Sequence, residues 1–291
     1  MSDVKVGNSM ESVTTVWRYM SLDKLINMFE TESIYFSPLS TYMISDPYEG
    51  FPPSVVIHPF ASVISKRNSE MKNEINSYIE SFHNEPYLQQ TMRENIKHIK
   101  SDQAPFSNTF KKVIKSTIVN CWHSNKNESE AMWRIYSENG NGIAIKSNVA
   151  SIVSALKNTD DESKINFGLV NYIDFNDENL TLSDCVIDGE LFSPLLKRTS
   201  FNHENEARLY IIPDINLENP LEQKIEAKLI KIDINTLIDA IHISPSASEL
   251  YRSSVRTICK KYGIDEQKIV DSDLLKGADD LLKLLMDDSG I

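Results

Sequence analysis

The stretch FNHENEARLYII, residues Phe201–Ile212, predicts a β-strand that begins with a group of charged side chains. Its second half, Ala207–Ile212, is mostly aliphatic and aromatic, as in a buried strand. Glu204, Glu206 and Arg208 alternate in the sequence, and side chains two positions apart in a strand point to the same face. We therefore expect two carboxylates and one guanidinium to project together from the start of this strand, as a surface ion-pair ladder or as part of a functional site.

Other strand-like runs lie on both sides of this stretch. They are Val13–Tyr19, Ser33–Ser37, Thr117–Trp122, Gly142–Lys146, Ile165–Tyr172, Lys228–Ile232 and Ala240–Ser244. Helical periodicity follows only some of them, with Ser21 and Asn148 as candidate N-caps and Pro245 at the expected start of another helix. Because helices do not regularly separate the strands, the sequence favours an α+β fold with a mixed, largely antiparallel central sheet over a doubly wound parallel sheet.

The chain is predicted to form a single α+β domain over residues 13–291. A polar segment with helical spacing, at about 61–115, is expected to be a helical insertion. A leucine-rich run, Ala278–Met286, is expected to end a C-terminal helical region. Residues 1–12 are polar and are predicted to be a flexible N-terminus.

Composition limits the classes of function. Of the 291 residues, 41% are hydrophobic and 25% are charged, which is the balance of a folded domain rather than of a disordered chain. The net charge of −12 would repel phosphate backbones, so nucleic acid is not the expected partner. The segment 61–115 differs, because its nine Lys/Arg and six Asp/Glu give it a net charge of +3, whereas the rest of the chain has a net charge of −15. Paired charges on a solvated helical face explain it, and a shallow basic patch for an acidic partner is the alternative.

Cysteines, histidines and apolar runs exclude further classes. Cys121, Cys185 and Cys259 are odd in number and lack metal-ligand spacing, which indicates free thiols in a reducing cytosol. No apolar run approaches the roughly 20 residues of a membrane span, and no apolar signal region begins the chain, so a cytoplasmic location is expected. The sequence lacks the Rossmann and P-loop glycine patterns, HExxH, CxxC and GxSxG, and its six histidines stand singly, so no metal is expected.

Two motifs in the first 50 residues carry candidate site residues. In Trp17–Tyr19, Arg18 could hold a phosphate or carboxylate while the rings stack on a planar group; the alternative is a strand with both rings in the core and the arginine in solvent. In Ser45–Glu49, Asp46 precedes a proline and is expected to accept backbone N–H bonds in a turn, or to join Glu49 in a pocket wall.

A third block lies between Cys121 and Tyr136. Cys121 and His123 are two positions apart in a predicted strand, so they share a face and could form a thiolate–imidazole pair, although no third group is evident to orient it. Met132, Trp133 and Tyr136 have helical spacing, which is more typical of a core stripe than of a ligand site.

In this order, the motifs resemble those of the bacterial family of domains of unknown function 2971 (DUF2971). The resemblance rests on Trp17–Tyr19, Ser45–Glu49, Cys121–Gly142 and Phe201–Arg208, and extends over about residues 16–274. Ser45 departs from the pattern, which has asparagine there. The resemblance implies a shared pocket but assigns no reaction to it.

A looser similarity is to ADP-ribosyltransferases, which use an early Arg or His, a middle aromatic motif and a Glu that opens a later strand. This similarity implies an NAD-using enzyme, such as a toxin or an anti-phage effector, in which Arg18 contacts the phosphates of NAD and Glu206 stabilises the transition state. The catalytic residues it implies are Glu206, Arg18 and Tyr136. The binding residues it implies are Tyr19, Trp122, Trp133, Glu204, Arg208 and Asp46.

Two alternatives stay open at this point. One is a non-catalytic module of a defence system that binds a nucleotide or a protein through the same residues. The other is a metal-dependent nuclease that uses the carboxylates of Asp46, Glu49, Glu204 and Glu206. The relative position of Arg18 and Glu206 bears on this choice, because residues on opposite faces of the sheet would be packing rather than a shared site.

Overall fold

The computed structural model describes residues 3–81, 86–87, 89–91, 93, 114–157, 163–190, 194–212, 226–275 and 277. The strands of the main sheet are β1 (Asp3–Val6), β2 (Val16–Met20), β3 (Ser33–Pro38), β4 (Ile118–Ser124), β5 (Ile143–Ser147), β6 (Lys164–Leu169), β9 (Glu206–Ile211), β10 (Lys228–Lys231), β11 (Ala240–Ile243) and β12 (Ile269–Asp271). Their order is β1-β6-β9-β4-β2-β5-β11-β12, with β3 beside β4 and β10 beside β3. Among these described strands of the main sheet, only β1–β6 and β11–β12 pair in parallel, so the predicted mixed, largely antiparallel sheet of an α+β fold is confirmed.

Outside the main sheet, the described residues form a small second sheet and several helices. β7 (Asn171–Ile173) and β8 (Leu196–Arg198) form a separate two-stranded parallel sheet. The α-helices include α1 (Leu22–Thr31), α2 (Ser54–Ser81), α5 (Glu130–Tyr136), α6 (Val149–Lys157), α7 (Ile234–Leu237) and α8 (Glu249–Lys261). The 3-10 helices are η1 (Asn8–Met10), η2 (Leu39–Ile44), η3 (Ser183–Cys185), η4 (Thr199–Glu204) and η5 (Glu266–Lys268).

The two faces of the main sheet are covered by different helices. On one face, α1, α6, α7 and α8 pack their apolar residues against alternate residues of the strands, including Trp122 and Leu209. On the other face, Met132 and Trp133 of α5 pack against β2. This alternation follows from the strand period of two, which sends successive side chains to opposite faces. A functional site at the sheet must therefore lie where this packing is interrupted.

The predicted starts of two helices have different outcomes. Asn148 caps α6, because its Oδ1 accepts a hydrogen bond from the main-chain N of Ser151 at 2.9 Å. The expected helix start at Pro245 is wrong. The helix begins at α8, where the hydroxyl of Ser248 accepts from the main-chain N of Tyr251 at 3.3 Å. Ser248 supplies the side-chain cap that a proline cannot, so the helix begins after it.

The N-terminus is not the flexible segment that its polarity predicts. Asp3 of β1 pairs with Lys164 of β6, which extends the sheet by one parallel edge strand. Ser9 follows, and its main-chain N and hydroxyl both donate to the carboxylate of Asp188 at 2.8 Å. Backbone pairing thus orders a stretch whose side chains show little apolar patterning.

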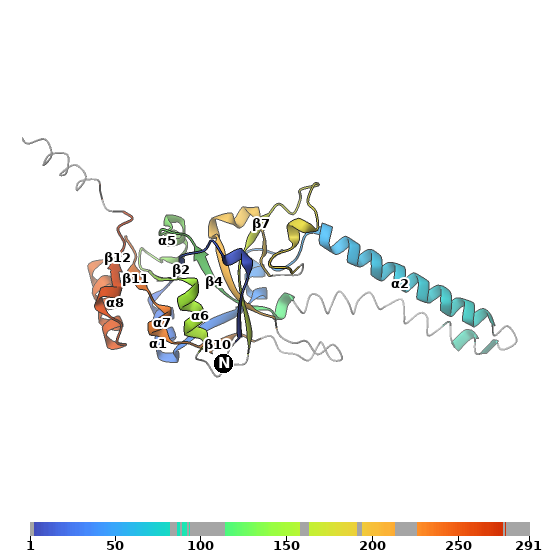
Figure 1. Cartoon of the computed structure of the whole chain (residues 1–291), viewed down its shortest axis with the longest axis horizontal. Coiled ribbons are helices and arrows are strands. Elements are labelled where there is room, and N and C mark those ends of the chain that lie inside the picture. Colours follow the sequence, from blue (N-terminus) through green and yellow to red (C-terminus); the bar gives the residue numbers. More distant parts are fainter. Residues whose placement is uncertain are drawn as a thin grey trace, which may run out of the picture.

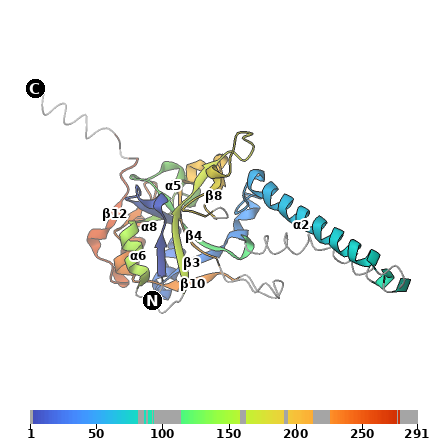
Figure 2. The same ribbon diagram turned by 45° about the vertical axis from the view of Figure 1, so that its right-hand side comes forward.

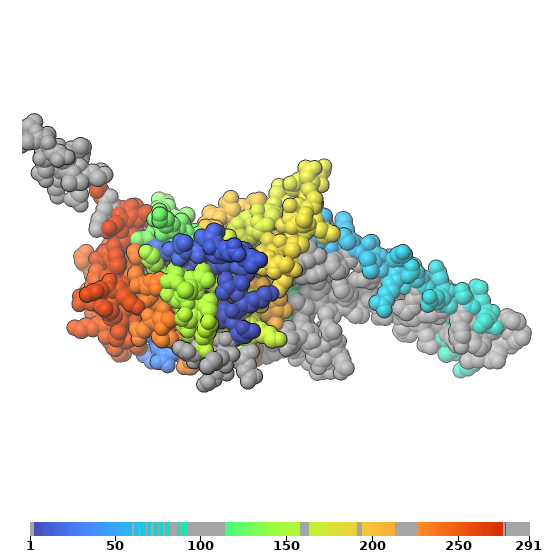
Figure 3. All heavy atoms as spheres, in the orientation of Figure 1, coloured from blue at the N-terminus to red at the C-terminus, as the bar shows by residue number. Residues whose placement is uncertain are grey.

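Helix α2 is the observed part of the predicted insertion. It begins at Ser54, earlier than expected, and its 28 residues reach about 42 Å at the usual helical rise. It extends away from the sheet in both ribbon views and forms a projection in the space-filling view (Figures 1, 2 and 3). Lys66 pairs with Glu70 one turn later at 3.9 Å, as on a solvated face with paired charges. Residues 94–113 and Ala278–Met286 lie outside the described residues. Among the described helices, none has the length and apolar character of a membrane span.

Candidate functional site

Strands β2 and β3 pair with the same edge of β4, one near each end of it. Trp17 of β2 pairs with His123, whereas Ser37 of β3 pairs with Val119. Between these points, no strand of the described residues pairs with β4 on this edge, so the sheet opens into a fork. Helix α1 connects the two strands that form the fork.

A cavity of about 610 Å³ lies in this fork. It is lined by residues of β2, α1, β3 and β4, by Met132 and Tyr136 of α5, by Glu204 at the end of η4 and by Glu206 at the start of β9. Its volume falls within the roughly 300–1,000 Å³ that is usual for small-molecule sites. The interruption of the sheet thus creates a space large enough for a ligand next to charged side chains.

Arg18 lies in the wall of the cavity and forms no ion pair with a carboxylate of the described residues. Its Nη1 donates to the main-chain O of Cys121 at 2.9 Å, and its guanidinium carbon lies 5.8 Å from the ring centroid of Trp122. Burial lowers the pKa of Arg18, and the nearby Cys121, Tyr42 and Tyr136 oppose this shift. A partly buried cation without a counter-ion is unfavourable, so this guanidinium is a candidate site for an anion.

Arg18 and Glu206 start from opposite faces of the sheet. Trp17 pairs with His123 and His123 pairs with Glu206, so these three side chains share a face, and Arg18 points to the other. By strand alternation alone, side chains on opposite faces would be packing residues rather than parts of a shared site. Both residues nevertheless line the cavity, because β2 separates from β4 beyond Trp17.

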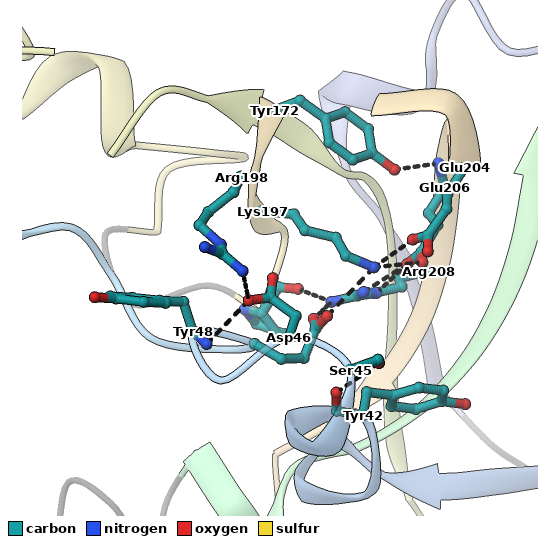
Figure 4. Close-up of polar contacts among 12 residues, drawn as sticks. Tyr42, Ser45, Asp46, Tyr48, Tyr172, Lys197, Arg198, Glu204, Glu206 and Arg208 are labelled. Atoms are coloured by element: carbon teal, nitrogen blue, oxygen red, sulfur yellow. Dashed lines mark hydrogen bonds and ion pairs between the residues drawn. The ribbon is translucent and has the colours of Figure 1, made fainter. Parts of the chain in front are cut away.

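A buried cluster of five charged side chains lies beside the cavity (Figure 4). The ammonium of Lys197 contacts three carboxylates, Glu49 at 3.3 Å, Glu206 at 3.1 Å and Glu204. Arg208 bonds two of them, with Nη1 2.8 Å from Oε1 of Glu49 and Nε 2.6 Å from Oε2 of Glu206. Both oxygens of Glu206 are therefore held by cations. The predicted convergence of Glu204, Glu206 and Arg208 is present, and it is mostly buried.

The two glutamates of this cluster have opposite pKa shifts. Burial would raise the pKa of Glu206, but the charges of Arg208 and Lys197 outweigh burial and hold its pKa well below the usual value. Burial and the adjacent Glu206 raise the pKa of Glu204 to about 7, against the attraction of Lys197. Carboxyl pairs whose environments separate their pKa values are typical of acid–base sites.

A second ion pair fixes the loop before α2. Oδ1 of Asp46 accepts from the main-chain N of Tyr48 at 3.0 Å, which confirms the predicted turn, and also binds Nη2 of Arg198 at 2.5 Å. The guanidinium of Arg198 lies 4.8 Å from the ring of Tyr48 and 5.5 Å from that of Phe201. Asp46, which was expected among the binding residues, is buried here and does not line the cavity.

The predicted aromatic residues divide between core and cavity. Trp133 is buried against Tyr19, with their ring centroids 4.9 Å apart, and donates from Nε1 to Glu128 at 2.9 Å. Trp133, which was expected among the binding residues, does not line the cavity and packs in the core instead, as the core-stripe interpretation expects. Tyr136 is 45% exposed and does line the cavity, where burial of its hydroxyl raises its pKa to about 12. Trp122 reaches the cavity from the core.

Cys121 and His123 share a face of β4, but their environments do not favour a thiolate–imidazole pair. Burial and the charge of Glu206 raise the pKa of the Cys121 thiol to about 12. Burial lowers the pKa of His123. Nδ1 of His123 lies 2.6 Å from the main-chain O of Glu204, so Nδ1 carries the hydrogen and donates it. The imidazole therefore holds the backbone of Glu204 in place.

The cavity brings together most of the predicted site. Its lining includes Arg18, Tyr19, Trp122, Tyr136, Glu204 and Glu206. Trp133, Arg208 and Asp46 lie behind this lining, although Arg208 binds Glu206 directly. Sequence reasoning assigned no role to Lys197. The sequence could have pointed to Lys197, because several buried carboxylates need a nearby cation and Lys197 lies only seven positions before Glu204.

Residues 132–209 match the family model described as Protein of unknown function (DUF2971). The resemblance to DUF2971 is thus confirmed over this segment. The matched DUF2971 segment includes Tyr136, Lys197, Glu204 and Glu206, and excludes Arg18. No curated protein and no solved structure matches the chain.

Proposed function

We propose that the cavity in the fork binds a nucleotide and that the protein is an ADP-ribosyltransferase-like enzyme that uses NAD. The observation that carries this proposal is Arg18, a partly buried guanidinium in the cavity wall without a carboxylate partner in the described residues. A phosphate group of the ligand supplies the missing counter-ion, and arginine binds phosphate through two parallel hydrogen bonds.

The rest of the lining suits the other parts of NAD. Trp17, Tyr19 and Tyr136 offer aromatic surface for a planar ring, and Glu204 offers a carboxyl for ribose hydroxyls. Breaking the bond between ribose and nicotinamide develops positive charge on the sugar, which nearby carboxylates stabilise. An acceptor that is a cellular macromolecule would make such an enzyme a toxin or an anti-phage effector.

The alternatives differ in how they use the carboxylates. A metal-dependent nuclease requires Glu49, Glu204 and Glu206 to face a divalent ion, yet these three surround the ammonium of Lys197. The arrangement therefore favours this alternative least. A non-catalytic nucleotide-binding module needs only Arg18 and the aromatic lining, and differs from the enzyme by the lack of turnover.

Incubation with NAD labelled in the adenylate part tests the proposal. We expect the wild type to bind NAD, release nicotinamide and transfer label to an acceptor in cell extract, and Arg18→Met to lose binding. Arg134→Met is the matched control, because Arg134 is exposed and pairs only with Glu130 one turn earlier. Binding without nicotinamide release would favour the non-catalytic module. Absence of NAD binding by the wild type would refute the proposal.

A further inference from the structure

The buried cluster beside the cavity has more carboxyl groups than cations. Among the described residues, the cations within contact distance of Glu49, Glu204 and Glu206 are Lys197 and Arg208. Three carboxylates and two cations leave one negative charge uncompensated. Since an uncompensated buried charge is costly, one of the three carboxyls is the group that most readily takes a proton.

The contacts identify which carboxyl this is. Glu49 binds Arg208 through one oxygen and Lys197 through the other, and its side chain is 0% exposed. Glu206 has the same two partners. In the part of the chain that the structure describes, Glu204 has Lys197 alone as a cationic partner, and it is the most exposed of the three, at 25%. It also lines the cavity. The surplus charge therefore lies on the carboxyl that a ligand can reach.

We infer that Glu204 is the carboxyl that takes up and releases a proton in this cavity, and that Glu206 positions it by holding Lys197 and Arg208. The charged and titratable groups around Glu204 come from every neighbouring element. They are Lys197 of β8, Glu206 and Arg208 of β9, Glu49 of the loop before α2, His123 of β4, Tyr136 of α5 and Tyr172 of β7.

The protonation of the surrounding groups leaves this role to Glu204. Burial raises the pKa of Tyr136 to about 12 and also raises that of Tyr172, so both stay protonated near neutral pH. Burial lowers the pKa of His123, whose Nδ1–H is already bonded to the main chain of Glu204. The pKa of Glu204 itself, about 7, is that of an acid–base group at neutral pH.

For its chemistry, the inference rests on the proposed function. In ADP-ribosyl transfer, the bond between ribose C1′ and the nicotinamide nitrogen breaks, and its electron pair leaves with nicotinamide, which becomes neutral. A bond forms between C1′ and an acceptor hydroxyl oxygen. The hydroxyl proton passes to the carboxylate of Glu204, which Lys197 stabilises in its charged form.

Titration without ligand tests the proton uptake independently of NAD. With side-chain ¹³C-labelled glutamate, we expect one carboxyl signal with a midpoint at about pH 7 that Glu204→Gln removes and Glu249→Gln, at an exposed glutamate, keeps. The main-chain amide of Asn205 in the wild type serves as a second reporter if the variant does not fold. A neutral midpoint that persists in Glu204→Gln, or its absence from the wild type, would overturn the inference.

The rate of nicotinamide release against pH separates this inference from the proposed function. We expect the wild-type rate to rise through about pH 7, and Glu204→Gln to fall about 100-fold or more and lose this dependence while still binding NAD. A full rate with an unchanged profile in Glu204→Gln would overturn the role of Glu204 alone. No release by the wild type would refute ADP-ribosyl transfer, and the carboxyl titration would then decide the proton uptake by itself.

Discussion

Glu49 and Arg208 form a buried ion pair, with Oε1 of Glu49 2.8 Å from Nη1 of Arg208. The pair joins the loop before α2 to β9, and neither side chain is more than 1% exposed. Because Lys197 and Glu206 share these partners, the same contacts also set the position of the carboxyls at the cavity. Stability and the geometry of the candidate site are therefore coupled in this protein.

Glu49→Gln should destabilise the fold strongly, since it leaves Arg208 and Lys197 with one carboxylate fewer in a buried environment. Removing one partner of a buried ion pair typically costs about 3–5 kcal/mol. Urea denaturation measures the loss of unfolding free energy. Glu249→Gln, at a side chain that is 97% exposed, is the matched control and should change stability by less than about 0.5 kcal/mol. Equal effects of the two substitutions would contradict the cluster described above.

The raised pKa of Glu204 should make stability fall as the pH rises. Its pKa is about 7 in the folded protein against an ordinary value of 4.5, so between these values the folded state binds more protons. This stabilising contribution is complete below about pH 4.5 and is lost as the pH rises through about 7. The lowered pKa of Glu206 acts only below this window.

Glu204→Gln stays neutral and should flatten this dependence. Between about pH 5 and pH 8, we expect the unfolding free energy of the wild type to fall by about 1–3 kcal/mol more than that of Glu204→Gln. Urea unfolding curves at several pH values in this range provide the comparison. Parallel curves for the two proteins would show that Glu204 has no raised pKa.

Trp133 and Tyr136 should separate stability from binding, although they lie on one helix. Trp133→Phe removes a buried hydrogen bond to Glu128 and should cost about 1–3 kcal/mol of unfolding free energy. Tyr136→Phe changes a partly exposed ring at the cavity and should leave stability within about 0.5 kcal/mol while it weakens NAD binding. Thermal unfolding and calorimetric titration with NAD measure the two effects, and the reverse pattern would exchange the roles of the residues.

Local sequence patterns predicted the parts of the site that depend on local geometry. Alternation in the strand placed Glu206 and Arg208 on one face, and the Asp46 turn followed from its own sequence. The fork was not predictable, because it depends on β2 and β3 sharing one edge of β4 across many intervening residues. The ordered N-terminus was missed for the same reason, since Asp3 is fixed by pairing with Lys164.

Cys121 should react slowly although it lines the cavity. With its pKa raised to about 12 by burial and by Glu206, little thiolate exists at neutral pH, and the thiolate is the reactive form. We expect alkylation by iodoacetamide at about pH 8 to be about 100-fold slower than in the urea-unfolded protein, as followed by mass spectrometry. Rapid alkylation of the folded protein would reopen the interpretation of Cys121 and His123 as a reactive pair.

The same substitution should cost much more stability at Arg208 than at Arg18. Arg208→Met leaves Glu49 and Glu206 short of a cation, so we expect a loss of about 3–5 kcal/mol. Arg18→Met removes a partly buried charge that has no carboxylate partner in the described residues, which relieves the cost of an unpaired charge. In return it loses the hydrogen bond to Cys121, worth about 1 kcal/mol, and the weak contact with the ring of Trp122.

The unfolding free energy of Arg18→Met should therefore fall by no more than about 1 kcal/mol, while NAD binding is lost. Urea denaturation and calorimetry on the two variants measure both quantities. Loss of NAD binding with little loss of stability would indicate that the charge of Arg18 serves a ligand. An Arg18→Met variant as unstable as Arg208→Met would show instead that Arg18 is structural.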